Sequence, residues 1–209
     1  MSIKNLVFDM GNVLISFDTV NILRKKGVTD EADIKLFCEK IFMSEEWQAY
    51  DRGVVDKSAF VSLIKKLPEK LSVLADEMIL KNIFVVDNSP PIKAMEELIK
   101  KAKNNGYKIY LLSNAGQDFY IYSKGIPALK YFDGLFVSSD YKLLKPEKEI
   151  YEAFLERFDL IASECLFVDD LQINIDGAAK CGIDGICFNA SKEDISVLYR
   201  KYAEKGVLI

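Results

Sequence analysis

The chain has 209 residues, of which 50% are hydrophobic and 29% charged, as in ordinary globular proteins of one domain with an insertion or two small domains. A formal net charge of −4 and the lack of any long basic cluster argue against a nucleic-acid partner. The sequence contains no histidine, which excludes Ser-His-Asp and Cys-His triads, histidine-ligated zinc and histidine phosphotransfer. Any chemistry must therefore use carboxylates, lysine, hydroxyl groups or a hard metal ion.

The first residues indicate where the protein works. They lead directly into an apolar, strand-like run, without the basic and long apolar segments of a signal peptide, and no apolar run reaches membrane-spanning length. The four cysteines, at positions 38, 165, 181 and 187, form no C-x-x-C pair, so we expect core thiols in a reducing cytosol rather than a zinc site. We therefore expect a cytoplasmic protein with no membrane partner.

Five short apolar runs are predicted β-strands, and they lie at residues 5–9, 108–114, 134–140, 165–170 and 185–189. Each run is continuously apolar rather than alternating, as expected of parallel strands buried on both faces. Helical patterns follow the later strands or precede them, at residues 90–106, 146–158, 174–182 and 193–206. This alternation predicts an α/β fold with a doubly wound, Rossmann-like parallel sheet.

Residues 16–86 interrupt the alternation. They read as consecutive helices with no convincing strand, for example with Phe60, Leu63, Ile64 and Leu67 on one face. We therefore expect a core domain made of residues 1–15 and 87–209, with a helical subdomain inserted at residues 16–86.

Polar side chains end the predicted strands, and ligands bind beyond the carboxyl ends of the strands in open α/β sheets. The strand ends read Asp9, Ser113-Asn114, Ser139-Asp140, Asp169-Asp170 and Asn189. Converging carboxylates repel one another, by about 4 kcal/mol at 4 Å in a medium of intermediate dielectric constant, and a bound cation relieves that repulsion. Oxygen ligands of this kind suit Mg²⁺. The alternative is that each aspartate caps the helix that follows its strand.

Lys145 precedes a helix predicted to begin at Pro146. A lysine at a helix N-terminus opposes the helix dipole, so it is unfavourable unless an anion such as phosphate binds there. On this basis, replacing Lys145 by alanine should weaken phosphate binding while leaving the fold unharmed or slightly stabilised. The alternative is an ordinary surface lysine.

The order of these motifs resembles that of the haloacid dehalogenase-like hydrolases. An aspartate after the first strand, Ser-Asn after the next core strand, Lys-Pro before a helix and Asp-Asp after a later strand cover almost the whole chain. The stretches "SSDYKLLKPEKEIYEAFLERF" and "CLFVDDLQINIDGAAKCGI" are especially similar to the third and fourth motifs of that family. The inserted helices resemble the family's substrate-selecting cap, and "FDMGNVL" resembles a subgroup that includes sugar 1-phosphate phosphatases.

The resemblance implies a phosphatase that hydrolyses a small phosphomonoester, with a sugar phosphate as the expected substrate. It makes Asp9 the nucleophile that forms an aspartyl-phosphate, with Ser113, the backbone of Asn114 and Lys145 holding the phosphoryl oxygens. It also implies a magnesium site. The ligands of that site would be the carboxylates of Asp9, Asp169 and Asp170 and the backbone carbonyl of Gly11.

Gly11 departs from the family pattern, because most phosphatases of the family have a second aspartate there as general acid. A glycine supplies a carbonyl but no proton, and acid catalysis is typically worth roughly 10²–10⁴-fold in rate. Asp18 and Asp51 are the first candidates for another proton donor. In the cap, Trp47, Tyr50, Asp51 and Arg52 are candidate substrate contacts, and packing between cap helices is the alternative for Trp47 and Tyr50.

Two other functions remain open on this fold. A 2-haloacid dehalogenase also uses an aspartate nucleophile and lacks the second aspartate, but it needs no metal and does not resemble the Asp169-Asp170 pair. A non-catalytic relative that binds a phosphorylated ligand or a protein is the third reading, although it would not require all the motif residues. The sequence fixes neither the substrate nor the oligomeric state.

Overall fold

The computed structural model describes residues 2–81 and 89–209. Its centre is a parallel sheet in the order β3-β2-β1-β4-β5. The strands are β1 (Asn5–Phe8), β2 (Lys108–Ser113), β3 (Gly134–Val137), β4 (Cys165–Asp169) and β5 (Asp184–Cys187). The α/β fold class and all five predicted strands are thus confirmed, with ends that differ by one to three residues.

The end of β3 corrects one prediction. The run 134–140 was predicted as strand to its end, but the strand stops at Val137, and Ser138–Tyr141 forms the short helix α9. Val137 pairs with Ser113, the last residue of β2. Because β3 is an edge strand, no partner remains beyond that pair. Ser139 and Asp140 therefore do not end a strand.

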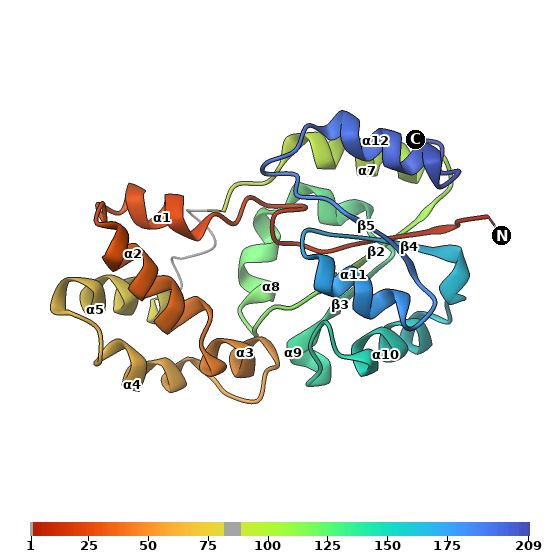
Figure 1. The fold of residues 1–209 in the computed structure, drawn as a ribbon. Coiled ribbons are helices and arrows are strands. Elements are labelled where there is room, and N and C mark those ends of the chain that lie inside the picture. The colour runs from red at the N-terminus through yellow and green to blue at the C-terminus, as the bar shows by residue number, and fades with distance from the viewer. Residues whose placement is uncertain (1, 82–88) are drawn as a thin grey trace.

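Alternate residues of the strands enter two hydrophobic clusters, one on each face of the sheet. Leu6 and Phe8 of β1 belong to one cluster, and Val7 between them belongs to the other. Helices α7 (Lys93–Asn104) and α12 (Ile195–Glu204) cover the first face, and α10 (Lys148–Phe158) and α11 (Gln172–Ala179) cover the second (Figure 1). Burial on both faces explains why the strands are continuously apolar.

The remaining elements of the core domain are short. They are helix α8 (Phe119–Tyr122) and the 3₁₀ segments Ser123–Gly125, Pro127–Tyr131 and Ala162–Glu164. Helix α8 follows β2 and its residue Phe119 is fully buried in the first cluster. The short helix therefore anchors the loop that leaves the carboxyl end of β2.

A group of helices follows β1 and lies to one side of the sheet (Figure 1). It comprises α1 (Thr19–Lys25), α2 (Glu31–Phe37), α3 (Glu45–Asp51), α4 (Val61–Ile64) and α5 (Glu69–Ala75), with π-helices at Cys38–Phe42 and Asp76–Leu80 and a 3₁₀ turn at Lys57–Phe60. Asp18, Asp30 and Ser44 cap α1, α2 and α3 through side-chain acceptors. These helices share a hydrophobic cluster of their own, so their stability rests on mutual packing.

We call residues 19–80 the helical region. The boundaries of the domain and the inserted subdomain stay predictions, and the predicted boundary between residues 86 and 87 lies outside the described residues. Within residues 16–81, the structure places helices and turns and no named strand.

Two further expectations concern the thiols and the membrane. All four cysteines are free, but only Cys165 is fully buried, and the other three are half-buried at the edges of the clusters. The expectation of core thiols is therefore correct for Cys165 only. Within residues 2–81 and 89–209, no helix has the length and apolar character needed to cross a bilayer.

Candidate active site

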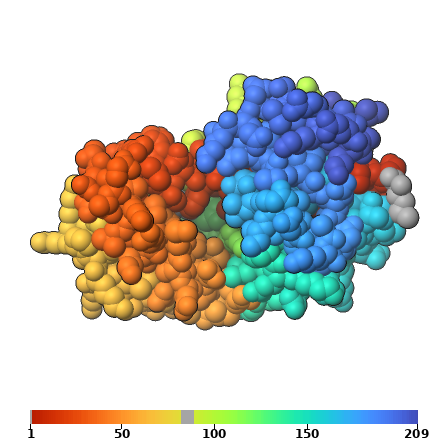
Figure 2. All heavy atoms as spheres, in the orientation of Figure 1, coloured from red at the N-terminus to blue at the C-terminus, as the bar shows by residue number. Residues whose placement is uncertain are grey.

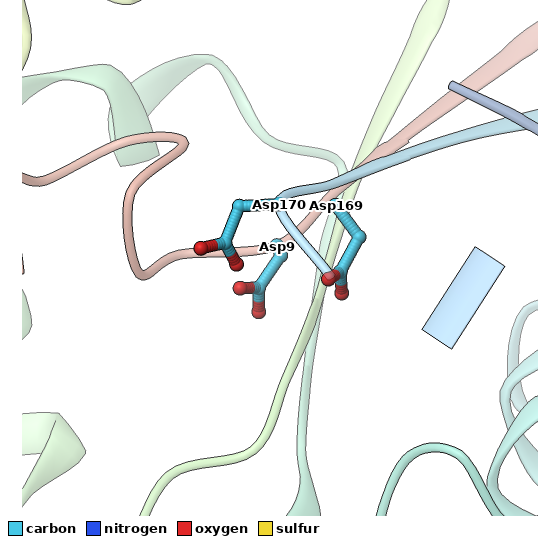
Figure 3. A group of neighbouring side chains, drawn as sticks. All are labelled: Asp9, Asp169 and Asp170. Atoms are coloured by element: carbon cyan, nitrogen blue, oxygen red, sulfur yellow. The ribbon is translucent and has the colours of Figure 1, made fainter. Parts of the chain in front are cut away.

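Three carboxylates meet at the carboxyl ends of the two central strands. Asp9 follows β1, Asp169 ends β4, and Asp170 comes next in the chain. β1 and β4 pair directly, so their ends are neighbours. The side chains point toward one another (Figure 3), and one oxygen of each lies within 4.8 Å of the others. The sequence-based prediction that these carboxylates converge agrees with this geometry.

Lys145 lies inside this group rather than on the surface. Its Nζ atom donates to Asp9 Oδ1 at 2.7 Å and to Asp169 Oδ2 at 2.6 Å, and its side chain is only 1% exposed. The predicted helix start is wrong, because α10 begins at Lys148 and Glu147 occupies the N-cap position. Lys145 therefore does not oppose a helix dipole. The anions it meets in the structure are the protein's own carboxylates.

Asp169 accepts four hydrogen bonds. Lys145 donates to Oδ2, the Leu171 N–H donates to Oδ1 at 2.9 Å, and the Asn174 amide lies 3.0 Å from both oxygens. A carboxylate has about four acceptor sites, so this one is fully used within the described residues. Its arrangement suits an anchor that positions Lys145.

Asp170 is held differently. Its Oδ2 accepts from the amides of Asn12, at 3.1 Å, and Asn189, at 3.3 Å. These bonds leave the acceptor sites of Oδ1 for another partner. Asn12 has a φ of +53°, a left-handed conformation that asparagine tolerates better than most residues.

Two of these holding residues, Asn12 and Asn174, are absent from the sequence-based prediction. Asn12 lies in the quoted "FDMGNVL" motif, and its residue type after Gly11 was a usable signal for a left-handed turn. Asn174 gave a weaker signal. Its amide meets the Asp169 carboxylate because of the path that α11 takes, and the sequence does not show that path.

Ser113 and Asn114 end β2 and follow it, respectively. Ser113 is buried, and Asn114, but not Ser113, lines the cavity described below. The Asn114 side chain bonds the backbone of Lys145 in both directions, accepting from its N–H at 2.9 Å and donating to its carbonyl at 3.0 Å. Asn114 thus fixes the loop that carries Lys145.

Gly11 and Asp18 lie on the segment after β1. A Cβ atom added at Gly11 would come no nearer than 3.9 Å to its neighbours, the first being Asp9 Oδ2. The space at this position therefore accepts a side chain, and the chain supplies none. Asp18 is exposed and accepts the Asn21 N–H at 2.9 Å as the N-cap of α1, so the structure gives it a local role.

A cavity of about 410 Å³ opens above the carboxylates, between the helical region and the sheet. Figure 2 shows a hollow between the two parts on the face it presents. Asp9, Gly11, Asn114 and Lys145 line the cavity on the sheet side.

The helical region supplies the opposite wall of the cavity. Trp47, Tyr50 and Asp51 of α3 line it, whereas Arg52 does not and instead forms a salt bridge with Glu147. Trp47 also packs edge-on against Phe42 and Phe60, with ring centroids 4.9 and 5.8 Å away. Packing and cavity lining therefore coexist for Trp47.

Burial and the neighbouring charges shift the pKa values of the ionisable groups in this site. Burial raises the pKa of Asp9 to about 7, with Lys145 opposing the rise and Asp169 adding to it. Burial also raises the pKa of Asp170, while its bond from Asn12 opposes this. Burial would lower the pKa of Lys145, but Asp169 and Asp9 together raise it, so the lysine stays charged. The cluster therefore holds more negative charge than one lysine neutralises.

Comparison with known proteins places this arrangement in a family. The haloacid dehalogenase-like hydrolase model matches residues 3–182. The chain belongs to the haloacid dehalogenase-like hydrolase family.

Individual relatives include phosphatases. The chain is 26% identical to a sesquiterpene phosphatase of Aspergillus oryzae over 184 residues, covering 88% of each protein. It is 28% identical to the D-ribitol-5-phosphate phosphatase of Bacteroides thetaiotaomicron over 193 residues, covering 87% of this chain and 90% of that one.

Among solved structures, a haloacid dehalogenase family enzyme of Bacteroides thetaiotaomicron is similar to this chain. The structure is that of a variant in complex with magnesium and inorganic phosphate. It is 25% identical with a TM-score of 0.69, and the match covers 95% of this chain and all of the other.

Proposed function

We propose that the protein is a magnesium-dependent phosphatase that hydrolyses a small phosphomonoester through an aspartyl-phosphate on Asp9. The observation that carries this proposal is the group of Asp9, Asp169 and the half-buried Asp170 beside Lys145, in which Asp9 and Lys145 line a cavity. Phosphoryl transfer needs a positioned nucleophile and fixed positive charge more than covalent machinery. Two phosphatases among the relatives support the same reaction.

Each residue of the site has a role in the proposed phosphoryl transfer. Asp9 attacks phosphorus as the ester P–O bond breaks, and water then hydrolyses the aspartyl-phosphate to free phosphate. Lys145 orients Asp9 and supplies positive charge, and the role we propose for the backbone of Asn114, a residue that lines the cavity, is to hold phosphoryl oxygens. Ser113, the buried last residue of β2, stays a proposed contact of the phosphoryl group. Because Asp9 and Lys145 are buried, their charges act in surroundings of lower dielectric constant than bulk water.

The donor set fits Mg²⁺, which prefers hard oxygen ligands. Asp9 Oδ2, Asp170 Oδ1 and the Gly11 carbonyl are the ligands we propose. Asp169, whose acceptor sites are used, would serve mainly to anchor Lys145. When bound, the ion would neutralise the charge on the phosphoryl oxygens and the carboxylates.

The alternatives explain less of this cluster. A metal-independent 2-haloacid dehalogenase would have no use for Asp170, whose pKa is raised by burial although its bond from Asn12 and the charge of Lys145 oppose the rise. A phospholigand-binding relative without catalysis would not need a carboxylate held beside the bound phosphate, because the two anions repel.

The first test measures phosphate release by the purified protein from a panel of phosphomonoesters, with Mg²⁺ and with excess EDTA. We expect turnover only with Mg²⁺. Turnover that survives complete chelation would contradict the metal-assisted mechanism, and release of halide from 2-haloacids would favour the dehalogenase.

Thermal melts give an independent readout of the metal. The raised pKa of Asp9 means that, in the metal-free protein, the stability this group contributes is present below its unfolded pKa and is lost as the pH rises through about 7. Mg²⁺ needs the ionised carboxylate, so its stabilising effect should be larger above pH 7 than below it. At 100 times its Kd the ion should add about 2.7 kcal/mol. Asp170→Asn should remove most of this shift.

The cavity wall favours an apolar organic group on the phosphate. Most of the side chains that line it are apolar or aromatic: Met10, Ile15, Phe17, Phe42, Trp47, Tyr50, Phe60, Met78, Ile79, Ile121, Tyr122 and Leu171. The hydroxyls of a sugar would face carbon over much of this wall, and unpaired polar groups are costly to bury. The relatives include both a sesquiterpene phosphatase and a sugar-alcohol phosphatase, so they leave both substrate classes open.

A series of primary alkyl phosphates tests this preference, because chain length changes while the basicity of the leaving alcohol stays nearly constant. From butyl to octyl phosphate, kcat/KM should rise by up to about fourfold per methylene, the equivalent of about 0.8 kcal/mol of apolar burial. Ribitol 5-phosphate and glucose 1-phosphate serve as polar comparisons. A flat alkyl series with faster sugar phosphates would restore the sugar-phosphate prediction.

A further inference from the structure

The proposed phosphatase lacks an acid at position 11, yet an alcohol leaving group needs a proton as its P–O bond breaks. Asp51 of α3 is a carboxyl group on the opposite wall of the cavity that Asp9 lines. Asp18, the other candidate, is exposed and caps α1. Asp51 is therefore the carboxyl group best placed to act on a ligand in the cavity.

Three consecutive residues attach this part of α3 to the core domain. Ser138 Oγ donates to the Asp51 backbone carbonyl, Arg52 forms a bidentate salt bridge with Glu147, and Lys142 Nζ donates to the Gly53 carbonyl. These bonds hold the backbone that carries the Asp51 carboxyl group, in the helical region, against the segment 138–147 that follows β3.

The Asp51 side chain is fixed as well. It accepts hydrogen bonds from the Trp47 side chain and from the backbone N–H of Gly116. Gly116 lies two residues after Asn114, on the loop that leaves β2 next to β1. A Cβ at Gly116 would lie 2.1 Å from the Tyr50 ring, so only glycine permits this close approach. Helix α3 therefore packs against the loop after β2 that contains Asn114 and Gly116.

The surroundings of Asp51 bring its pKa close to neutral pH, so the carboxyl group can both give and take a proton there. Burial raises the pKa of Asp51 to about 7; its two hydrogen bonds oppose this rise, Asp9 adds to it and Lys145 opposes it. A general acid works best when its pKa is near the working pH, and a pair of carboxyl groups in one site can divide nucleophile and acid roles between them.

We propose that Asp51 is the general acid of this phosphatase and replaces the carboxyl group that Gly11 lacks. As Asp9 attacks phosphorus and the P–O bond to the organic group breaks, Asp51 gives its proton to the departing oxygen. In the second step Asp51, now a carboxylate, takes a proton from the water that attacks the aspartyl-phosphate, which returns the site to its starting state. This inference rests on the proposed function.

The test compares two esters of similar shape, 4-nitrophenyl phosphate and 4-nitrobenzyl phosphate. The nitrophenolate leaves without a proton, and the benzyl alkoxide needs one. kcat/KM reports the steps up to departure of this group, so slow breakdown of the aspartyl-phosphate does not mask the effect. Asp51→Asn should lower kcat/KM for the benzyl ester by roughly 10²–10⁴-fold and for the phenyl ester by less than tenfold.

Two controls accompany this variant. Asp56→Asn makes the same change five residues away, at an exposed cap where asparagine is equally suitable, and should leave both esters unaffected. Gly11→Asp, for which the structure has space, should restore turnover of the benzyl ester in the Asp51→Asn protein.

The outcomes separate the claims. Equal losses on both esters would make Asp51 a structural residue, and no loss on either would mean that another group supplies the proton; both overturn the inference. If Asp51→Asn does not fold, the test uses Gly11→Asp in the otherwise native protein and measures its gain in kcat/KM on the benzyl ester. A gain on the benzyl ester above 100-fold would show that the native protein has no acid, and a gain of a few-fold supports Asp51. No turnover of either ester by the native protein with Mg²⁺ would refute the proposed function instead.

Discussion

Asp9→Asn should reduce phosphatase turnover to background, a loss on the order of 10⁴-fold or more, as for other enzymes that lose a nucleophile. The amide is too weak a nucleophile to attack phosphorus, and it also removes one proposed metal ligand. The fold should survive, because ionised Asp9 has a raised pKa and is unfavourable above pH 7, so a neutral amide of the same shape relieves repulsion.

Three measurements check this expectation. Turnover is compared with that of Asp18→Asn, which should keep full activity because asparagine caps a helix as well as aspartate. Thermal melts should give Asp9→Asn a melting temperature at least equal to that of the native protein without metal. Rapid quenching during turnover should find covalent phosphate on Asp9 of the native protein. Activity in Asp9→Asn above a hundredth of the native value would contradict the assigned nucleophile.

Lys145→Met should destabilise the metal-free protein by about 3–5 kcal/mol. The methionine fills most of the space, but Asp9 and Asp169 then remain buried without their counter-charge, and removing one partner of a buried ion pair has a cost of this size. Without Lys145, the folded-state pKa of Asp9 rises further, so the loss should be largest above pH 7 and shrink as falling pH protonates Asp9.

Urea unfolding on either side of pH 7 measures this loss. Lys148→Met is the matched control, because the Lys148 side chain is exposed and pairs with Glu152, and an exposed pair is worth at most about 1 kcal/mol. Saturating Mg²⁺ should recover part of the stability of Lys145→Met by supplying positive charge to the same carboxylates. A loss below 1 kcal/mol with no dependence on pH would show that the buried pairs are energetically unimportant.

This expectation reverses the one drawn from the sequence. The predicted position of Lys145 at the N-terminus of a helix implied that its removal would leave the fold unharmed or slightly stabilised. The local sequence pattern could not show that α10 starts at Lys148, two residues later than predicted, nor that the ammonium group turns inward between Asp9 and Asp169. A lone lysine in a sequence carries no signal of its burial, because the carboxylates that make burial tolerable are 24 and 136 residues away.

For the same reason, the sequence could not decide which residues of the helical region face the cavity. Trp47, Tyr50, Asp51 and Arg52 were candidates as a group, and the structure separates them: Arg52 bonds Glu147, while the other three line the cavity. Their division depends on how α3 meets the loop at Gly116, a contact between segments about 65 residues apart. No periodicity in either segment encodes that contact.

The sequence alone determined the five strands, the helices between them and the carboxylates at the central strand ends. Those features follow from short-range causes: continuous apolar runs form buried parallel strands, and parallel strands place their carboxyl ends on one edge. Tertiary structure decided what each polar group meets: Lys145 between two aspartates, Asp169 saturated by Asn174 and its neighbours, and Asp51 facing the cavity of Asp9. Such contacts join distant segments, and burial and charge there depend on packing in three dimensions, which no local pattern records.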